Sequence, residues 1–162
     1  MPRQVSAGVL AWRRRGAAVE FLLVHPGGPF WANKDAAAWS IPKGVAEPGE
    51  DGWAAARREF EEELGQPVAA LGEPWPLSPC QTGGGKLVLA WLVRAEVDAA
   101  SVRSNSFEME WPPRSERRES FPEVDRAAWF DAATAMTKIH QGQQPILREA
   151  AERLGINLLS ES

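Results

Sequence analysis

Four segments of the chain have the apolar pattern of β-strands. Residues 5–12 (VSAGVLAW) predict a strand that ends at the arginines 13–15, and residues 19–25 (VEFLLVH) predict its antiparallel partner. Residues 86–97 (KLVLAWLVRAEV) are apolar on both faces, which is typical of a central strand. Residues 123–131 (EVDRAAWFD) predict one more short strand.

The segments between these strands have the composition of loops. Proline and glycine punctuate residues 26–38 (PGGPFWANKDAAA), which predicts a loop, and residues 39–44 (WSIPKG) predict a short extended piece. Residues 98–122 are polar and contain the pair Pro112–Pro113, so a long loop is expected there.

Three segments have the pattern of α-helices. The first is expected at about 52–64, with Asp51 as its N-cap and Gly65 just past its C-terminus. Two more are expected at 132–138 and about 144–154. Strands and helices alternate without an internal repeat or linker, which predicts a mixed α/β fold.

Acidic and apolar residues occupy different faces of the helix at 52–64. At about 100° per residue, Glu62 falls near −60° and Glu63 near +40° from Glu59, so these three carboxylates share one face. An apolar stripe falls between about +60° and +140°. Its members are Trp53, Ala56, Phe60 and Leu64. Glu61 falls outside both groups and is expected to be solvated.

The carboxylates of Glu59, Glu62 and Glu63 lie near the C-terminus of this predicted helix, where the helix dipole disfavours negative charge. An exposed carboxylate near a helix C-terminus is unfavourable by about 0.3–1 kcal/mol. The pair formed by Arg58 and Glu62 at spacing i,i+4 offsets only about 0.2–0.5 kcal/mol. Helix spacing alone leaves two interpretations open. One is a solvated charged face, and the other is a site for a hard divalent cation such as Mg²⁺.

Composition narrows the class of protein. The 162 residues are 44% hydrophobic and 25% charged, which fits a soluble globular chain and a single domain over residues 1–162. The net charge of −4 does not attract polyanions, and no basic stripe indicates DNA binding. Cys80 is the one cysteine, so an intrachain disulfide is excluded. No signal peptide or membrane span is expected, which makes the cytoplasm the default location.

The spacing around the acidic helix resembles the Nudix box of the Nudix hydrolase family. That box reads G-x5-E-x7-R-E-U-x-E-E-x-G-U, where U is a bulky apolar residue. The chain has Gly44, then Glu50, then REFEEELG over residues 58–65 at this spacing, and it departs only at Gln66, in the last apolar position. The likeness covers residues 5–155 and implies a Nudix-type α/β/α sandwich with a mixed central sheet.

The resemblance also implies a chemistry. Family members hydrolyse a diphosphate bond in a nucleoside diphosphate linked to another moiety, with Mg²⁺ or Mn²⁺ as cofactor. By position, the metal ligands would be Glu59, Glu62, Glu63 and the carbonyl of Gly44. Glu62 or Glu63 would orient or deprotonate the attacking water. Glu50 and Arg58 would pair and hold the loop against the helix.

Residues outside the box are weaker candidates. Glu119 and Glu123 flank the start of the last predicted strand and are candidates for a further base or ligand, although each is also readable as a surface acid. Residues that would meet phosphate or a base are Lys43, Arg114, Arg117, Arg118, Trp31 and Trp111. The two histidines, His25 and His140, are isolated, and a metal role is not expected for either.

Two functions from different classes fit the box. The first is a Nudix pyrophosphohydrolase whose substrate is a nucleotide-type small molecule, with a nucleoside triphosphate or dinucleoside polyphosphate favoured by the positive charge in residues 103–118. Residues 25–44 also resemble a bacterial group of predicted nucleoside-triphosphate pyrophosphohydrolases. The alternative is a non-catalytic sensor module that binds a nucleotide or ADP-ribose. Exposed tryptophans would permit a homodimer without requiring one.

Overall fold

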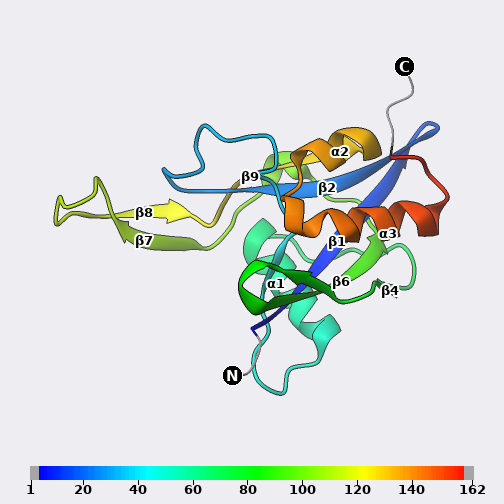
Figure 1. Ribbon diagram of the computed structural model, residues 1–162, viewed down its shortest axis with the longest axis horizontal. Helices are drawn as coiled ribbons and strands as arrows, with labels where there is room; N and C mark the ends of the chain where they lie inside the picture. Colours follow the sequence, from blue (N-terminus) through cyan, green and yellow to red (C-terminus); the bar gives the residue numbers. More distant parts are fainter. Residues whose placement is uncertain (1–3, 159–162) are drawn as a thin grey trace.

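A mixed β-sheet forms the centre of the structure, a computed structural model that describes residues 4–158 (Figure 1). Its strands are β1 (Val5–Arg15), β2 (Ala18–Pro26), β3 (Lys43–Val45), β4 (Trp75–Pro76), β5 (Cys80–Thr82), β6 (Lys86–Arg94) and β9 (Val124–Asp131). They run in the order β4-β6-β1-β2-β9, with β3 paired to β1 and β5 paired to β6. The pair β1–β6 is parallel and the pairs β1–β2 and β2–β9 are antiparallel, as in the mixed sheet expected from the sequence.

Helices cover both faces of this sheet. The α-helices are α1 (Gly52–Leu64), α2 (Ala132–Lys138) and α3 (Gln144–Leu154), and short 3₁₀ turns lie at Gly83–Gly85, Ala99–Ser101 and Gln141–Gln143. The predicted α/β/α sandwich and its three helices are therefore confirmed. None of the helices within residues 4–158 has the length and hydropathy needed to cross a bilayer.

Side chains on the two faces of β1 contribute to two separate hydrophobic cores. Val9 and Ala11 are buried with Phe60 in the core under α1, whereas Leu10 is buried with Leu147 in the core under α2 and α3. Successive side chains of a strand point to opposite faces, so one apolar strand contributes to both cores. The continuous apolar runs in the sequence follow from this double burial.

The edge of β1 that meets β2 also receives β3. The end of β1 from Trp12 to Arg15 pairs with β2, and its beginning, Ser6–Gly8, pairs with β3. β3 thus enters where β1 and β2 diverge, and it carries Gly44 to the side of α1. The sheet topology therefore places the glycine of the box beside its glutamates.

The first strand is longer than expected. Arg13, Arg14 and Arg15 were expected to end it, but β1 continues to Arg15 and turns at Gly16, whose φ is +61°. The reason is a cross-strand ion pair. Arg13 lies opposite Glu20 on β2, and its Nη2 is 2.8 Å from the Glu20 carboxylate. Opposite charges at facing positions stabilise an antiparallel pair.

The expectation of one long loop over residues 98–122 is wrong. This segment forms a hairpin of β7 (Ser106–Glu110) and β8 (Arg118–Pro122), which extends from the body of the molecule (Figure 1). Phe107 faces Phe121 across the hairpin, with ring centroids 6.0 Å apart. The pair Pro112–Pro113 lies in the turn between the strands, so it ends the strand without excluding a hairpin.

Both ends of α1 lie where the sequence predicts. The Asp51 carboxylate accepts a hydrogen bond from the Ala54 N–H at 3.0 Å and caps the N-terminus. Gly65 ends the helix in the left-handed conformation, with its N–H bonded to the Glu61 carbonyl at 2.7 Å.

We expect Gly65→Ala to destabilise the fold by about 1–3 kcal/mol. The φ of Gly65 is +70°, and an added Cβ would lie 2.6 Å from the Arg103 carbonyl oxygen. Gly155→Ala is the matched control, because Gly155 ends α3 at φ +67° and its added Cβ would meet nothing within 4 Å. Urea unfolding should show a larger loss for Gly65→Ala, and equal losses would contradict the close approach to Arg103.

Candidate active site

The buried stripe of α1 orients its acidic face. Phe60 and Leu64 are fully buried against the sheet, whereas Glu61 is exposed, as the helical geometry predicts. Trp53 is only half-buried and packs against Trp91, with ring centroids 6.0 Å apart. Because the apolar side is held by the core, the face with Glu59, Glu62 and Glu63 is directed along the edge of the sheet near β3.

Arg58 joins the loop before α1 to the helix. Its Nε and Nη2 donate to the two carboxylate oxygens of Glu50 at 2.9 and 3.0 Å, a bidentate pair. Its Nη1 donates to Glu59 at 2.9 Å and reaches Glu62 at 3.3 Å, and Nη2 also reaches the Val45 carbonyl. One guanidinium therefore fixes the loop, β3 and two of the acids.

The pair of Glu50 and Arg58 should make stability depend on acid pH. Hydrogen bonds from Arg58 lower the pKa of Glu50 from its usual 4.5 to about 2. A lowered folded-state pKa gives stabilisation that is complete above pH 4.5 and is lost as the pH falls towards 2. We expect the Tm of the wild type to fall more steeply in this window than that of Glu50→Gln. The control Glu61→Gln, at an exposed position, should follow the wild type, and parallel curves for Glu50→Gln would contradict the pair.

Glu63 points to a cavity between β2, β3 and β9. The cavity has a volume of about 200 Å³, and its lining residues are Val24, Pro26, Ser40, Lys43, Glu63, Glu123 and Val124. The Lys43 N–H donates to the Glu63 carboxylate at 3.2 Å. Burial raises the pKa of Glu63 to about 8 and lowers the pKa of the Lys43 ammonium. The surroundings of the Glu63 carboxyl and the Lys43 ammonium disfavour the charged form of each, and such shifted pKa values are typical of functional sites.

Gly44 is in close contact with the acidic face. A Cβ added at Gly44 would lie 1.9 Å from Oε2 of Glu59 and 2.1 Å from its Cδ. Burial, and then the charge of Glu62, raise the pKa of Glu59. The backbone of β3 thus lies directly against the Glu59 carboxylate, and any residue with a Cβ at position 44 would collide with it.

The donor set fits a hard divalent cation. Carboxylate and backbone carbonyl oxygens are the ligands that Mg²⁺ prefers. Burial, first of all, raises the pKa of Glu59 and of Glu63, so the protein by itself disfavours the charged form of both carboxylates. Within residues 4–158, no three His, Cys, Asp or Glu side chains already converge for metal binding, and the Arg58 guanidinium lies between Glu59 and Glu62. A cation would therefore compete with Arg58 for these carboxylates.

Candidates from outside the box separate into two groups. Lys43 and Glu123 line the cavity with Glu63. Glu119 lies on β8 opposite Met109, and it does not line the cavity. The same holds for Arg114, Arg117 and Arg118 at the far end of the hairpin, where Arg118 is 3.7 Å from Glu108.

The two loop tryptophans do not line this cavity. Trp31 is 36% exposed, with the Lys34 ammonium 5.0 Å from its ring centroid. Trp111 contacts Phe30, with ring centroids 5.6 Å apart, so the hairpin tip meets the loop 27–38. The Gly27 N–H also donates to the Glu123 carbonyl at 2.9 Å. Loop and hairpin thus form one wall that continues from Glu123.

His25 holds this loop in place. No metal role was expected for it, and it is fully buried with Nδ1 2.9 Å from Asp125 and Nε2 2.6 Å from the Lys34 carbonyl. At the end of the loop, the Asp35 carboxylate accepts from the Trp39 indole at 2.8 Å and pairs with Lys138. These partners are far apart in sequence, so no local pattern indicates them.

The departure at Gln66 has a structural explanation. Its side-chain amide donates to the Asp98 carbonyl at 2.8 Å and accepts from the Asp98 N–H at 3.2 Å. This two-bond pairing fixes the segment after α1 to the segment after β6. Gln66 therefore stabilises the packing of these two segments through hydrogen bonds, away from the acidic face.

Known proteins resemble the chain in sequence and in fold. Bis(5'-nucleosyl)-tetraphosphatase [asymmetrical] of Caenorhabditis elegans is 40% identical over 58 residues, which are 36% of this chain and 38% of that protein. RNA pyrophosphohydrolase of Rhodopseudomonas palustris is 52% identical over 40 residues, 24% of this chain and 23% of that protein. The chain thus spans less than two-fifths of the length of these curated relatives.

The whole fold is matched by a solved structure. The Ap4A hydrolase binary complex of C. elegans superposes with a TM-score of 0.64 at 24% identity, covering 94% of this chain and 98% of that one. At this identity the likeness concerns the fold. The family model described as the NUDIX domain matches residues 2–150 of the sequence. This match includes the complete box on β3 and α1, and the chain belongs to the Nudix family.

Proposed function

We propose that this chain is a pyrophosphohydrolase that uses Mg²⁺ or Mn²⁺ to cleave a diphosphate bond in a nucleoside diphosphate linked to another moiety. The observation that carries the proposal is the half-buried carboxylate of Glu63, which lines a cavity together with Lys43 and Glu123 and lies next to Glu59 and Glu62 on α1. Both curated relatives have names of hydrolases that act on such bonds, which supports the same reaction class.

Four groups of the chain would hold the cation. They are the carboxylates of Glu59, Glu62 and Glu63 and the carbonyl of Gly44. When bound, a divalent cation supplies positive charge to the diphosphate oxygens and acidifies a water molecule. Arg58 holds the helix and the loop in register through Glu50, so that Glu59 and Glu62 stay on one side of the site.

Side chains of the protein perform the proton transfer and the binding of phosphate. Glu63 or Glu62 orients the attacking water and accepts its proton, since Glu63 lines the cavity and Glu62 lies next to it on the acidic face of α1. The ammonium of Lys43 binds a phosphate oxygen at the cavity wall. Glu123 is a further ligand or base, since it lines the same cavity and raises the pKa of Glu59 and of Glu63.

The substrate we favour is a dinucleoside polyphosphate or a nucleoside triphosphate. Arg114, Arg117 and Arg118 lie on the hairpin among four glutamates, and they would contact a long phosphate chain through single guanidinium hydrogen bonds. Trp31 lies in the loop 27–38 and Trp111 at the tip of the hairpin that meets this loop, and each would offer an indole ring for stacking of a base. The relative named a tetraphosphatase supports the dinucleoside class.

A substrate panel tests this proposal. The purified chain is incubated with dinucleoside polyphosphates, nucleoside triphosphates, ADP-ribose, nucleotide sugars and triphosphorylated RNA, and the products are separated by chromatography. We expect turnover with millimolar Mg²⁺ or Mn²⁺ and loss of turnover with a chelator, restored by added metal. If nucleotides bind by calorimetry in the presence of metal but none is cleaved, the sensor function replaces the enzymatic one.

A further inference from the structure

The segment that leads into β3 crosses from β2 to β1. Ser40 pairs through its backbone with Val24 of β2, at N–O distances of 2.8 and 2.9 Å. Two residues later, the Pro42 carbonyl accepts from the Val9 N–H of β1 at 3.1 Å. Ile41 lies at the crossing and is fully buried, and a buried backbone N–H must find an acceptor.

Gln143 supplies that acceptor from the segment between α2 and α3. Its side chain belongs to a residue that is only 4% exposed, and its Oε1 accepts from the Ile41 N–H at 3.1 Å. Because a backbone N–H can only donate, this bond fixes which way the amide faces. The Nε2 is thereby turned to Ser40, whose Oγ accepts from it at 3.0 Å. One buried amide thus holds two consecutive residues of the crossing.

The 3₁₀ turn that carries Gln143 is itself held in place. The Gln143 N–H donates to the His140 carbonyl at 2.9 Å, and the Gly142 N–H donates to Nδ1 of His140 at 3.1 Å. The Cys80 thiol of β5 donates to the Gly142 carbonyl at 3.3 Å. The chemistry proposed for the box uses neither His140 nor Cys80, and both hold this turn. Gln143 is therefore a fixed point against which the crossing is placed.

The crossing leads directly to the proposed active site. Ser40 lines the cavity together with Glu63, and the Lys43 N–H donates to the Glu63 carboxylate at 3.2 Å. Gly44 follows, so close to Glu59 that an added Cβ would lie 1.9 Å from its Oε2. A displacement of β3 would therefore disturb both carboxylates, and a misplacement near 1 Å can cost about 10²-fold in rate.

We propose that Gln143 is a positioning residue of the active site. It holds Ile41 and Ser40 where the chain crosses from β2 to β1. It thereby places Lys43 and Gly44 against the acidic face of α1. The effect on catalysis rests on the proposed function, whereas the placement is a property of the chain and is measured without substrate or metal.

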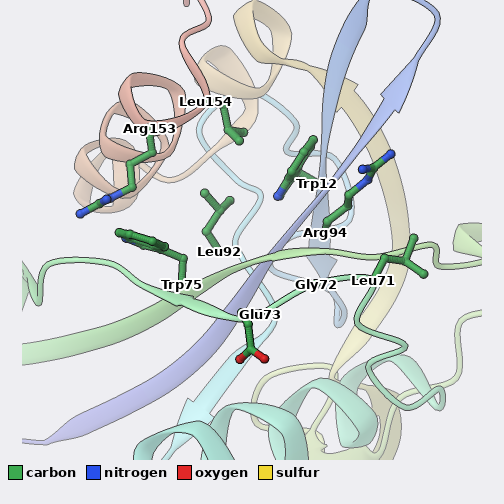
Figure 2. A pocket seen from close by; sticks show the side chains of 9 residues that line it. All are labelled: Trp12, Leu71, Gly72, Glu73, Trp75, Leu92, Arg94, Arg153 and Leu154. Carbon is green, nitrogen blue, oxygen red and sulfur yellow. The ribbon is translucent and has the colours of Figure 1, made fainter.

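Amide NMR spectra of the metal-free chain test the placement. Gln143→Met keeps the length of the side chain and removes both of its hydrogen-bonding groups. We expect the amide signals of Lys43 and Gly44 to shift, and the Lys43 amide to exchange with solvent about tenfold faster. The signals of Trp75 and Arg94, which line a hollow where β4 forms the edge of the sheet, should stay in place (Figure 2).

Kinetics measured well below the Tm of each variant test the consequence. We expect Gln143→Met to lower kcat/KM about 10²-fold and to raise the Mg²⁺ concentration needed for half-maximal rate. Gln143→Glu should keep most of the rate, because a carboxyl group still accepts from the Ile41 N–H and bonds the Ser40 hydroxyl. Ser40→Ala removes one of the two bonds and should cause a smaller loss. The control Gln141→Met, at an exposed position of the same turn, should match the wild type.

The outcomes separate this inference from the proposed function. It is overturned if folded Gln143→Met keeps the wild-type signals of Lys43 and Gly44, or if kcat/KM is unchanged while only Tm falls, which would assign Gln143 to the fold alone. If the signals move but the wild type cleaves no substrate, the placement is supported and the proposed function fails. If Gln143→Met does not fold, the same outcomes are judged on Ser40→Ala.

Discussion

Exchange of Glu63 for glutamine is expected to lower kcat by about 10²–10⁴-fold without unfolding the protein. A neutral amide carries no charge for a cation and accepts no proton from water. It keeps the shape of the side chain, and its Oε1 can still accept the Lys43 N–H that bonds Glu63 at 3.2 Å. Because burial raises the pKa of Glu63 to about 8, the fold disfavours the charge, and its removal should leave Tm unchanged or higher.

Steady-state kinetics and thermal unfolding by circular dichroism measure the two effects separately. Glu62→Gln should also lose turnover by orders of magnitude, whereas the control Glu61→Gln, at an exposed position on the same helix, should match the wild type in both measurements. Loss of the folded spectrum in Glu63→Gln would mean that the acid is structural. Unchanged kcat would remove Glu63 from the proposed mechanism.

The sequence predicts most of the fold because apolar patterns record burial. β6 is apolar on both faces because it lies between β4 and β1 and contributes to both cores. The ends of α1 are predictable because Asp51 and Gly65 are residue types that begin and end helices through local hydrogen bonds and backbone conformation. The hairpin of β7 and β8 was not predicted from the sequence because few of its side chains are buried. Alternation in SFEME, with Phe107 and Met109 on one side, was the available signal, and charge and proline obscured it.

The sequence predicts the part of the site that lies on a single helix, but it does not predict the contacts between residues of different elements. Helical periodicity is sufficient to place Glu59, Glu62 and Glu63 on one face. The contact of Glu63 with Lys43, and the position of Glu123 in the same cavity, depend on how β3 and β9 approach α1. No local rule states such distances. For the same reason, sequence spacing alone could not choose between Glu119 and Glu123 as the acid nearer the cavity.

The replacement Gly44→Ala is expected to lower kcat/KM by about 10²-fold, the loss that a misplacement near 1 Å can cause. The new Cβ would lie 1.9 Å from Oε2 of Glu59, so one of the two groups must move. β3 is paired with β1 through Ser6–Gly8, whereas the Glu59 carboxylate is the end of a flexible side chain. We therefore expect Glu59 to move and the fold to remain, with more Mg²⁺ needed for half-maximal rate.

A double-mutant cycle tests whether Gly44 acts through Glu59. If Gly44→Ala only displaces this carboxylate, then adding it to Glu59→Ala should cause little further loss, because the group that it displaces is already absent. Gly83→Ala is the control, since its added Cβ would meet nothing within 4 Å, and it should keep wild-type kinetics. Fully additive losses would contradict the contact. They would mean that position 44 affects catalysis through its backbone, by a route independent of the Glu59 side chain.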